Sequence, residues 1–218
     1  MEQAVLTISS KNYSSWSLRG WLMMKFSGLS FEEHMVSLDD ASVRAEILLL
    51  APSILVPCLT HKGLKVWDTL AIGEYLNEVR PKAGLIPADL AARTHCRSIC
   101  GEMHSGFTSL RSALPMNIRG RFKNFKIWER AQADIERINS IWTDCLTTYG
   151  GPFLFGSKPG LADAMYAPVV SRFITYDVEL TLAASTYSKA ILELPAMQEW
   201  IAAALAEPEQ IEELESEF

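Results

Sequence analysis

The stretch RPKAGLIPADL divides the chain into two halves with different patterns. It carries Pro81, Gly84 and Pro87, and such Pro and Gly content is typical of a connecting segment. Short apolar runs alternate with helical patterns before it, whereas long helical patterns follow it almost without interruption. We therefore expect two domains and a linker, which occupy residues 1–82, 88–218 and 83–87 respectively.

The first half is predicted to alternate strands and helices. Apolar or alternating runs mark the strands, and a spacing of three to four residues marks the helices. The expected elements are strand 4–9, helix 14–26, strand 31–38, helix 41–50, strand 56–61, strand 64–67 and helix 69–79. This order predicts a βαβ unit followed by a ββα unit.

The second half is predicted to be all helical. A helix over 89–114 is expected to bend at Gly101 and Gly106, and the almost wholly apolar run 161–178 is expected to be a central helix. Two further helices are expected over 124–149 and 196–208. The acidic tail, residues 209–218, is expected to be a solvated end.

Composition excludes several classes of protein. Hydrophobic residues make up 49% of the 218 positions, which argues against disorder, and the net charge of −6 argues against nucleic acid as a partner. No apolar run approaches about 20 residues, so no membrane span is expected. The N-terminus lacks the basic start and long apolar run of a signal peptide, so a cytoplasmic protein is expected.

The four cysteines do not have the spacing of a metal site. Cys96 and Cys100 lie one helical turn apart, but no CxxC pair and no matching His pair accompanies them. Together with Cys58 and Cys145 they are expected to be buried or free thiols, and no metal is expected.

Polar residues lie where two helices of the first half are expected to begin. Ser14 and Ser15 precede the first helix, and Asp68 and Thr69 precede the third. Such residues cap helices, but a helix N-terminus also favours bound anions, and Asp68 could accept from an ammonium group. A ligand with an α-amino acid end would suit the Asp68-Thr69 pair.

A Val-Pro pair opens the third strand. If the Val56-Pro57 bond is cis, Val56 can present its backbone N–H and C=O to an extended peptide ligand. A trans proline at a strand start is the alternative, and the residues alone leave the two equally open.

Four segments together resemble the glutathione transferase family, in particular its serine-type, zeta-like members. These segments are NYSSWSLR, LVPCL, VWDTLAIGEYL and FLFGSKPGLADAMYAPV. The resemblance covers nearly the whole chain. It implies an N-terminal thioredoxin-like βαβ–ββα domain and a C-terminal all-helical domain.

The resemblance also implies roles for individual residues. Ser14 matches the catalytic serine, whose hydroxyl can donate a hydrogen bond to the glutathione thiolate. Glutathione, as co-substrate, would be bound by Ser15, Leu55, Val56, Pro57 (as the cis proline), Asp68 and Thr69. Ser15 is expected to cap the helix or line the pocket, and Tyr13 is a less favoured donor to the sulfur. Asp163 is expected to cap the central helix, and Arg19 to be a structural charge.

The sequence departs from the family pattern at a few positions. Ile54 and Leu55 replace the usual Gly and basic or Gln residue, so glutathione could be bound weakly. Gly160 replaces the usual Ser or Thr at the cap of the central helix, at an expected cost of only a few tenths of a kcal/mol. Trp16 replaces the Cys with which the isomerase activity of zeta-type members is associated.

An electrophile pocket is expected between the domains. Its candidate residues are Trp16, Met103, His104, Phe107, Leu110 and Met116. His104 could act as a base or polar wall, although a lone helical histidine is more often a packing residue, and Met and aromatic residues at helical spacing are usually core. A homodimer is also expected from the resemblance.

Two functions follow from these observations. The first is a glutathione transferase that conjugates glutathione to small hydrophobic electrophiles, with peroxide reduction or reductive cleavage as related outcomes of the same site. The alternative is a noncatalytic protein of the same fold that binds a protein partner or apolar ligands. Ser14, Val56, Asp68 and Thr69 favour catalysis, whereas Ile54 and Leu55 favour the alternative.

Overall fold

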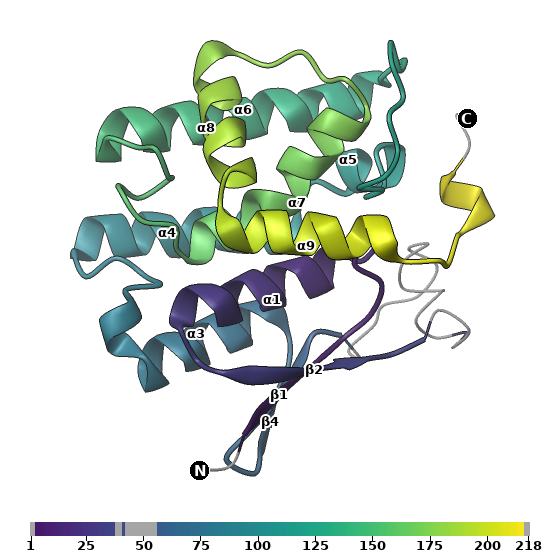
Figure 1. Cartoon of the computed structure of the whole chain (residues 1–218). Coiled ribbons are helices and arrows are strands. Elements are labelled where there is room, and N and C mark those ends of the chain that lie inside the picture. The colour runs from purple at the N-terminus through teal and green to yellow at the C-terminus, as the bar shows by residue number, and fades with distance from the viewer. Residues whose placement is uncertain (1–2, 38–40, 42–55, 216–218) are drawn as a thin grey trace.

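A computed structural model describes residues 3–37, 41 and 56–215. A four-stranded sheet and its helices form the first half, and helices form the second (Figure 1). The described elements of the first half are β1 (Ala4–Ile8), α1 (Ser15–Ser27), β2 (Phe31–Met35), β3 (Cys58–His61), β4 (Leu64–Val66) and α3 (Thr69–Val79). The helix expected over 41–50, together with Ile54 and Leu55, falls outside the described residues apart from residue 41.

The sheet has the strand order β2-β1-β3-β4. β1 pairs in parallel with β2 and antiparallel with β3, and β3 pairs antiparallel with β4. Ala4, Leu6 and Ile8 of β1 are buried, because alternate side chains of a strand point to the same face. α1 and α3 pack together and lie between the sheet and the helical half (Figure 1).

The second half is helical, as predicted. Its elements are α4 (Leu90–Ser105), α5 (Thr108–Ala113), α6 (Glu129–Tyr149), α7 (Leu161–Thr175), α8 (Leu182–Leu192) and α9 (Pro195–Ala206), with short 3-10 turns at Pro81–Ala83 and Glu212–Leu214. α7 is buried along nearly its whole length and packs on α1, α4 and α8, which confirms it as the central helix. The expected fold class is confirmed, while the boundary at 83–87 stays a prediction.

Several expected helices have different bounds. The helix expected over 89–114 is two helices, because the C-cap of α4, Gly106, has an extended backbone and Phe107 has a left-handed φ of 55°. Gly101, an expected bend, lies within α4. The helix expected from residue 124 begins at Glu129, and α8 was not predicted.

The described part of the acidic tail, residues 209–215, is not simply a solvated end, although Glu209, Gln210, Glu212 and Glu213 are exposed. Ile211 and Leu214 are buried and form with Tyr13 a small apolar cluster separate from the main core. Glu207 and Glu215 bind residues of the β1–α1 loop and Arg119. The expectation from local composition was therefore wrong, because the partners of the tail lie far away in the sequence.

The cap of α7 leads to a stability prediction. A Cβ at Gly160 would lie 2.6 Å from the backbone oxygen of Leu85, so there is no room for the serine usual in the family. We expect Gly160→Ser to lower the free energy of unfolding by about 1–3 kcal/mol, the cost of overpacking, although serine is the better cap. Urea unfolding measures this effect.

Gly101 offers a matched control, because a Cβ there meets nothing within 4 Å. Gly101→Ala should leave stability unchanged or raise it by up to about 1 kcal/mol, since alanine has the higher helix propensity. A Gly160→Ser protein as stable as the wild type would contradict the steric argument.

Candidate functional site

Ser14 is the N-cap of α1. Its Oγ accepts a hydrogen bond from the backbone N–H of Ser17 at 3.3 Å and donates to Ser17 Oγ at 2.9 Å. Its own N–H donates to the backbone oxygen of Ser10 at 3.0 Å. The Ser14 hydroxyl therefore lies at the positive end of α1, and rotation of its O–H away from Ser17 would direct the hydrogen to a ligand.

Ser15 does not cap α1, contrary to the first of its two expected roles. Its Oγ accepts a hydrogen bond from the guanidinium of Arg172 at 3.2 Å. Because Arg172 is the donor in that contact, the Ser15 hydroxyl keeps its own hydrogen for another acceptor. Ser15 thus connects the start of α1 to α7.

Three arginines lie close together beside the start of α1. Arg19 and Arg172 are buried, and burial, followed by repulsion from Arg111, lowers the pKa of Arg172 to about 10. The pKa of Arg19 is lowered by burial and by repulsion from Arg111 and Arg172. Among the described residues no carboxylate forms an ion pair with any of the three, and only Asp134 favours the charged form of Arg111 at longer range.

Trp16 contacts two of these cations. The guanidinium carbon of Arg19 is 4.6 Å from the Trp16 ring centroid, and that of Arg111 is 5.1 Å away. Arg19 Nη1 and Arg111 Nε are buried and have no hydrogen-bond partner among the described residues. Because buried polar atoms are normally paired, these two nitrogens and the excess positive charge are the features of an anion site.

Arg19 is partly the structural charge that was expected. Its Nε donates to the backbone oxygen of Met165 at 2.8 Å, and its Nη2 approaches the sulfur of Met103 at 3.3 Å. These contacts attach α1 to α7 and α4. Such a role does not explain Nη1, which has no hydrogen-bond partner in the described part of the chain.

Asp68 caps α3 and also contacts the helical half. Its Oδ1 accepts from the backbone N–H groups of Leu70 and Ala71, and its Oδ2 lies 2.9 Å from His104 Nε2. The His104 ring lies 5.2 Å from the Trp16 ring. His104 therefore connects the Asp68-Thr69 pair to Trp16, and its imidazole is not simply a packing group.

Thr69 follows Asp68 and is buried. Its Oγ1 has no hydrogen-bond partner among the described residues. A buried hydroxyl without a partner at a helix start is suited to a ligand carboxylate. Val56 is also buried, and the Val56-Pro57 bond is cis, as expected, while Leu55 lies outside the described residues.

The electrophile-pocket candidates separate into two groups. Trp16 and His104 are partly exposed and contact each other. Met103, Phe107, Leu110 and Met116 are buried in the main core. Of the six candidates only Trp16 and His104 are thus accessible, and Trp16 has the guanidinium groups of Arg19 and Arg111 beside its ring.

The hydroxyl of Tyr13 is committed to other contacts. It donates to Glu215 and accepts from Arg119 Nη2 at 2.9 Å and from the backbone N–H of Ile211 at 3.1 Å. Burial and then the bond to Glu215 raise the pKa of Tyr13, so this hydroxyl stays protonated. These contacts disfavour Tyr13 as the donor to a thiolate.

Comparison with known proteins agrees with this geometry. Residues 13–79 match the model of the glutathione S-transferase N-terminal domain, and residues 125–203 match that of the C-terminal domain. Maleylacetoacetate isomerase of Rattus norvegicus is 30% identical over 189 residues, which are 84% of this chain and 85% of that protein. The chain belongs to the glutathione S-transferase family. By class it is therefore a glutathione transferase.

Other relatives support the same assignment. Glutathione S-transferase 1 of Dianthus caryophyllus is 28% identical over 80% of each chain. A glutathione transferase homologue from Burkholderia, solved with bound glutathione, has a TM-score of 0.70 and 23% identity, and the match covers 94% of this chain and all of that one. Maleylacetoacetate isomerase of Anaeromyxobacter dehalogenans, also solved with glutathione, has a TM-score of 0.68 and 22% identity over 95% and 97% of the two chains. Because both are less than 25% identical to this chain, these two structures show that the fold is shared and no more.

Sequence reasoning missed Arg111 and Arg172 in this glutathione transferase. Arg172 carried one usable signal, because a single cation in the apolar run 161–178 must find buried partners. Arg111 lies in the short helix α5 and carried no such signal. Only the fold brings them to Arg19 and Trp16.

The described residues contain no group of three or more metal-ligating side chains that could hold a metal ion. All four cysteines are free, as expected, and burial raises the pKa of the Cys145 thiol to about 12. Across the described part of the chain, no helix is both long and apolar enough to cross a membrane.

Proposed function

We propose that this glutathione transferase binds glutathione at the Ser14 end of α1 and conjugates its thiolate to a small electrophile. The observation that carries the proposal is the Ser14 hydroxyl at a helix N-terminus, next to three arginines that form no ion pair with any carboxylate of the described residues. The two structural neighbours solved with glutathione support the choice of co-substrate.

The chemistry follows from the charge of the thiolate. A free thiol has a pKa of about 8.5 and is mostly protonated at neutral pH. Ser14 donates a hydrogen bond to the thiolate, and the N-terminus of α1 and the nearby guanidinium groups favour negative charge. One pKa unit corresponds to about 1.4 kcal/mol, which a single charge-assisted hydrogen bond can supply.

The rest of glutathione is held by the other sequence-predicted residues. Thr69 and the N-terminus of α3 bind the γ-glutamyl carboxylate of glutathione. Asp68 Oδ2, which also contacts His104, accepts a hydrogen bond from the γ-glutamyl ammonium group. Val56, before the cis proline Pro57, pairs with the peptide backbone. Ser15 and Leu55 are the remaining residues that we propose to bind glutathione.

We infer that the electrophile has an apolar part and an anionic group. Trp16 offers a ring face to the apolar part, and Arg111, less buried than Arg19 and Arg172, is placed to meet a carboxylate. This narrows the expected small hydrophobic electrophile to one that carries negative charge.

A second candidate function is glutathione-dependent isomerisation of an unsaturated dicarboxylic acid. It is favoured by the rat relative named maleylacetoacetate isomerase and by an Anaeromyxobacter structure with bound dicarboxyethyl glutathione and citrate. Trp16 in place of the zeta-type Cys argues against it. Assays for product isomers and for thioether products separate the two functions. Retention on glutathione resin separates both functions from the noncatalytic alternative, for which we expect no retention and no turnover.

Arg111→Gln tests the anionic electrophile. For conjugation of a chloronitrobenzoate we expect kcat/KM to fall about tenfold or more, because a charge-assisted hydrogen bond contributes roughly 1.5–3 kcal/mol. The methyl ester of the same compound should change less than about threefold. Steady-state kinetics with both compounds measures the difference.

Arg137→Gln is the control, because Arg137 is an exposed arginine on α6 that pairs with Glu102. It should leave both compounds unaffected. Equal losses for acid and ester in Arg111→Gln would show a structural role for Arg111 and contradict the anion site.

We also propose that the protein is a homodimer, as the resemblance implies. Large apolar side chains are exposed in both halves, among them Leu64, Trp67 and Leu90, and a partner chain would cover such residues. Light scattering at micromolar concentration should give about twice 24.3 kDa. A 24.3 kDa particle would contradict the dimer.

A further inference from the structure

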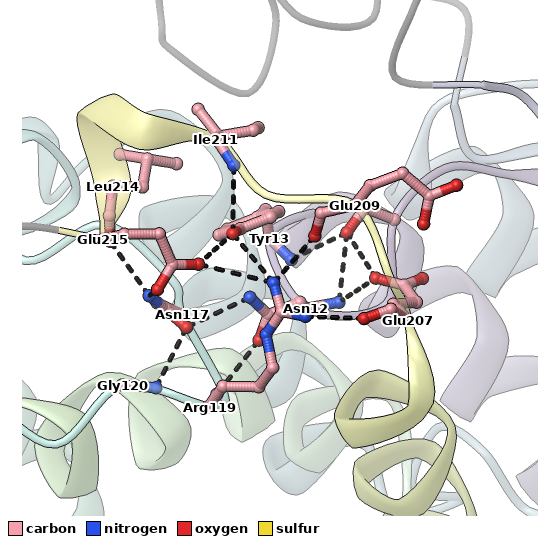
Figure 2. A network of polar contacts seen from close by, with 11 residues as sticks. Asn12, Tyr13, Asn117, Arg119, Gly120, Glu207, Glu209, Ile211, Leu214 and Glu215 are labelled. Atoms are coloured by element: carbon pink, nitrogen blue, oxygen red, sulfur yellow. Dashed lines mark hydrogen bonds and ion pairs between the residues drawn. The ribbon is translucent and has the colours of Figure 1, made fainter.

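The loop between β1 and α1 is held by the C-terminal segment 207–215, which we call the strap. The strap follows α9, which runs alongside α1, and it reaches the start of α1 from the far end of the chain (Figure 1). Figure 2 shows that Asn12 and Tyr13 of the loop lie among residues of the strap and of segment 117–120.

Glu207 binds several donors of the loop. Its Oε2 accepts from Ser10 Oγ at 2.7 Å and from the backbone N–H of Asn12 at 3.0 Å, and its Oε1 accepts from the backbone N–H of Lys11. Glu207 is also the C-cap of α9, where the helix dipole disfavours a carboxylate. The loop donors offset that unfavourable position.

Ser10 connects Glu207 to Ser14. Its hydroxyl donates to Glu207 and accepts the backbone N–H groups of Asn12 and Tyr13, each at 3.2 Å. Its backbone oxygen accepts the N–H of Ser14 at 3.0 Å. Two hydrogen bonds through a single residue therefore lead from the strap to the N-cap of α1.

The far end of the strap holds the loop through Tyr13. The Tyr13 hydroxyl is bound by Glu215, Arg119 and the N–H of Ile211, and its ring packs on Ile211 and Leu214. Arg119 also donates to the backbone oxygen of Glu207 at 2.6 Å. Figure 2 shows Arg119 between the two ends of the strap.

We propose that the strap positions Ser14 for thiolate stabilisation, with Glu207 as the main positioning residue. This inference rests on the proposed function of Ser14. A donor aimed at a developing or bound anion loses effect when its position shifts, because the interaction depends on distance and angle. Glu207 touches neither sulfur nor electrophile, so it acts only through the loop.

Glu207→Ala tests this role. The thiol pKa of bound glutathione, followed by ultraviolet absorbance, should rise, and kcat should fall about tenfold. KM for glutathione should change less than about threefold, because the residues proposed to bind its backbone and γ-glutamyl end lie on other segments. Glu207→Gln keeps one acceptor oxygen and should fall between the wild type and Glu207→Ala.

Two further variants separate positioning from stability. Tyr13→Phe removes the hydroxyl contacts at the other end of the strap and should shift the thiol pKa in the same direction. Glu212→Gln removes a charge from an exposed residue of the same segment and should leave the thiol pKa and kcat unchanged. In the Ser14→Ala background, Glu207→Ala should cause no further shift, since residues that act through one another are not additive.

The outcomes distinguish this inference from the proposed function. If Ser14→Ala shifts the thiol pKa and Glu207→Ala does not, the strap is only structural and the inference is overturned. If neither variant shifts it, the role of Ser14 fails, and hydrogen exchange at the amides of Lys11 and Asn12 decides whether the strap holds the loop. Faster exchange in Glu207→Ala supports holding of the loop, and unchanged exchange overturns it.

Discussion

Replacing Ser14 with alanine is expected to raise the thiol pKa of bound glutathione and to slow conjugation by about ten- to a thousandfold, the range for losing one aimed donor. The Ser14 hydroxyl lies at the N-terminus of α1, so the variant would lose the proposed hydrogen bond to the thiolate but keep the helix dipole. Titration of the thiolate by ultraviolet absorbance measures the pKa, and steady-state kinetics measures the rate.

Ser14 has an observed role as the N-cap of α1 and a proposed role as donor to the thiolate, and Ser14→Gly separates them. Because Ser14 is the N-cap, alanine should also cost about 1 kcal/mol of stability, whereas glycine should cost only a few tenths. Both variants lack the hydroxyl, so conjugation should slow by the same factor in both. A Ser14→Gly protein with the wild-type rate would show that the hydroxyl is needed for capping alone.

Ser15→Ala is the parallel variant. Ser15 accepts from Arg172 rather than capping α1, so its removal should cost less in rate than the removal of Ser14. If Ser15→Ala raises the thiol pKa and Ser14→Ala does not, the two assignments must be exchanged. In that case Arg172 would strengthen the donor, since a cation bound to a hydroxyl makes its hydrogen more acidic.

The parts of the fold that depend on local pattern were predicted from the sequence. Gly28 ends α1 in a left-handed conformation and Gly150 ends α6 in the same way, as helix stop signals predict. The cap of α3 was narrowed to Asp68 or Thr69, and it is Asp68. Such signals lie within a few residues of the feature that they determine.

The parts that depend on distant contacts were not predicted. Arg19, Arg111 and Arg172 come from α1, α5 and α7, and no local pattern marks their approach. The acidic tail was expected to be solvated because of its composition, yet Glu215 of the tail and Glu207 just before it meet donors about 200 residues earlier. Locally polar segments become structured when the fold supplies the partners.

Replacing Asp163 with alanine is expected to destabilise the protein more than any other single change considered for α7. Asp163 is almost fully buried, its Oδ1 accepts from the N–H of Leu154 at 3.0 Å, and its Oδ2 accepts from the N–H of Gly160 at 2.8 Å. Alanine leaves the buried N–H of Leu154 and the partly buried N–H of Gly160 without these acceptors. At about 1–3 kcal/mol each, the loss should be roughly 2–6 kcal/mol in urea unfolding.

Asp89→Ala is the matched control, because Asp89 caps α4 at an exposed position. It should cost about 1 kcal/mol, the usual value for a lost cap. Asp163→Asn keeps one acceptor oxygen and should lie between the two. Equal losses for Asp163→Ala and Asp89→Ala would contradict the importance of burial.

The same carboxylate should make stability depend on pH. Burial raises the pKa of Asp163 to about 6, against about 3.9 in an unfolded chain, although the backbone hydrogen bonds from Leu154 and Gly160 oppose the shift. Between these values the folded state binds more protons, so the contribution of Asp163 to stability falls as pH rises from about 4 to 6. Neither Asp163→Asn nor Asp163→Ala can titrate at this position. The difference in unfolding free energy between wild type and Asp163→Asn should therefore change by about 3 kcal/mol over this range, and a constant difference would show that Asp163 keeps an ordinary pKa in the folded protein.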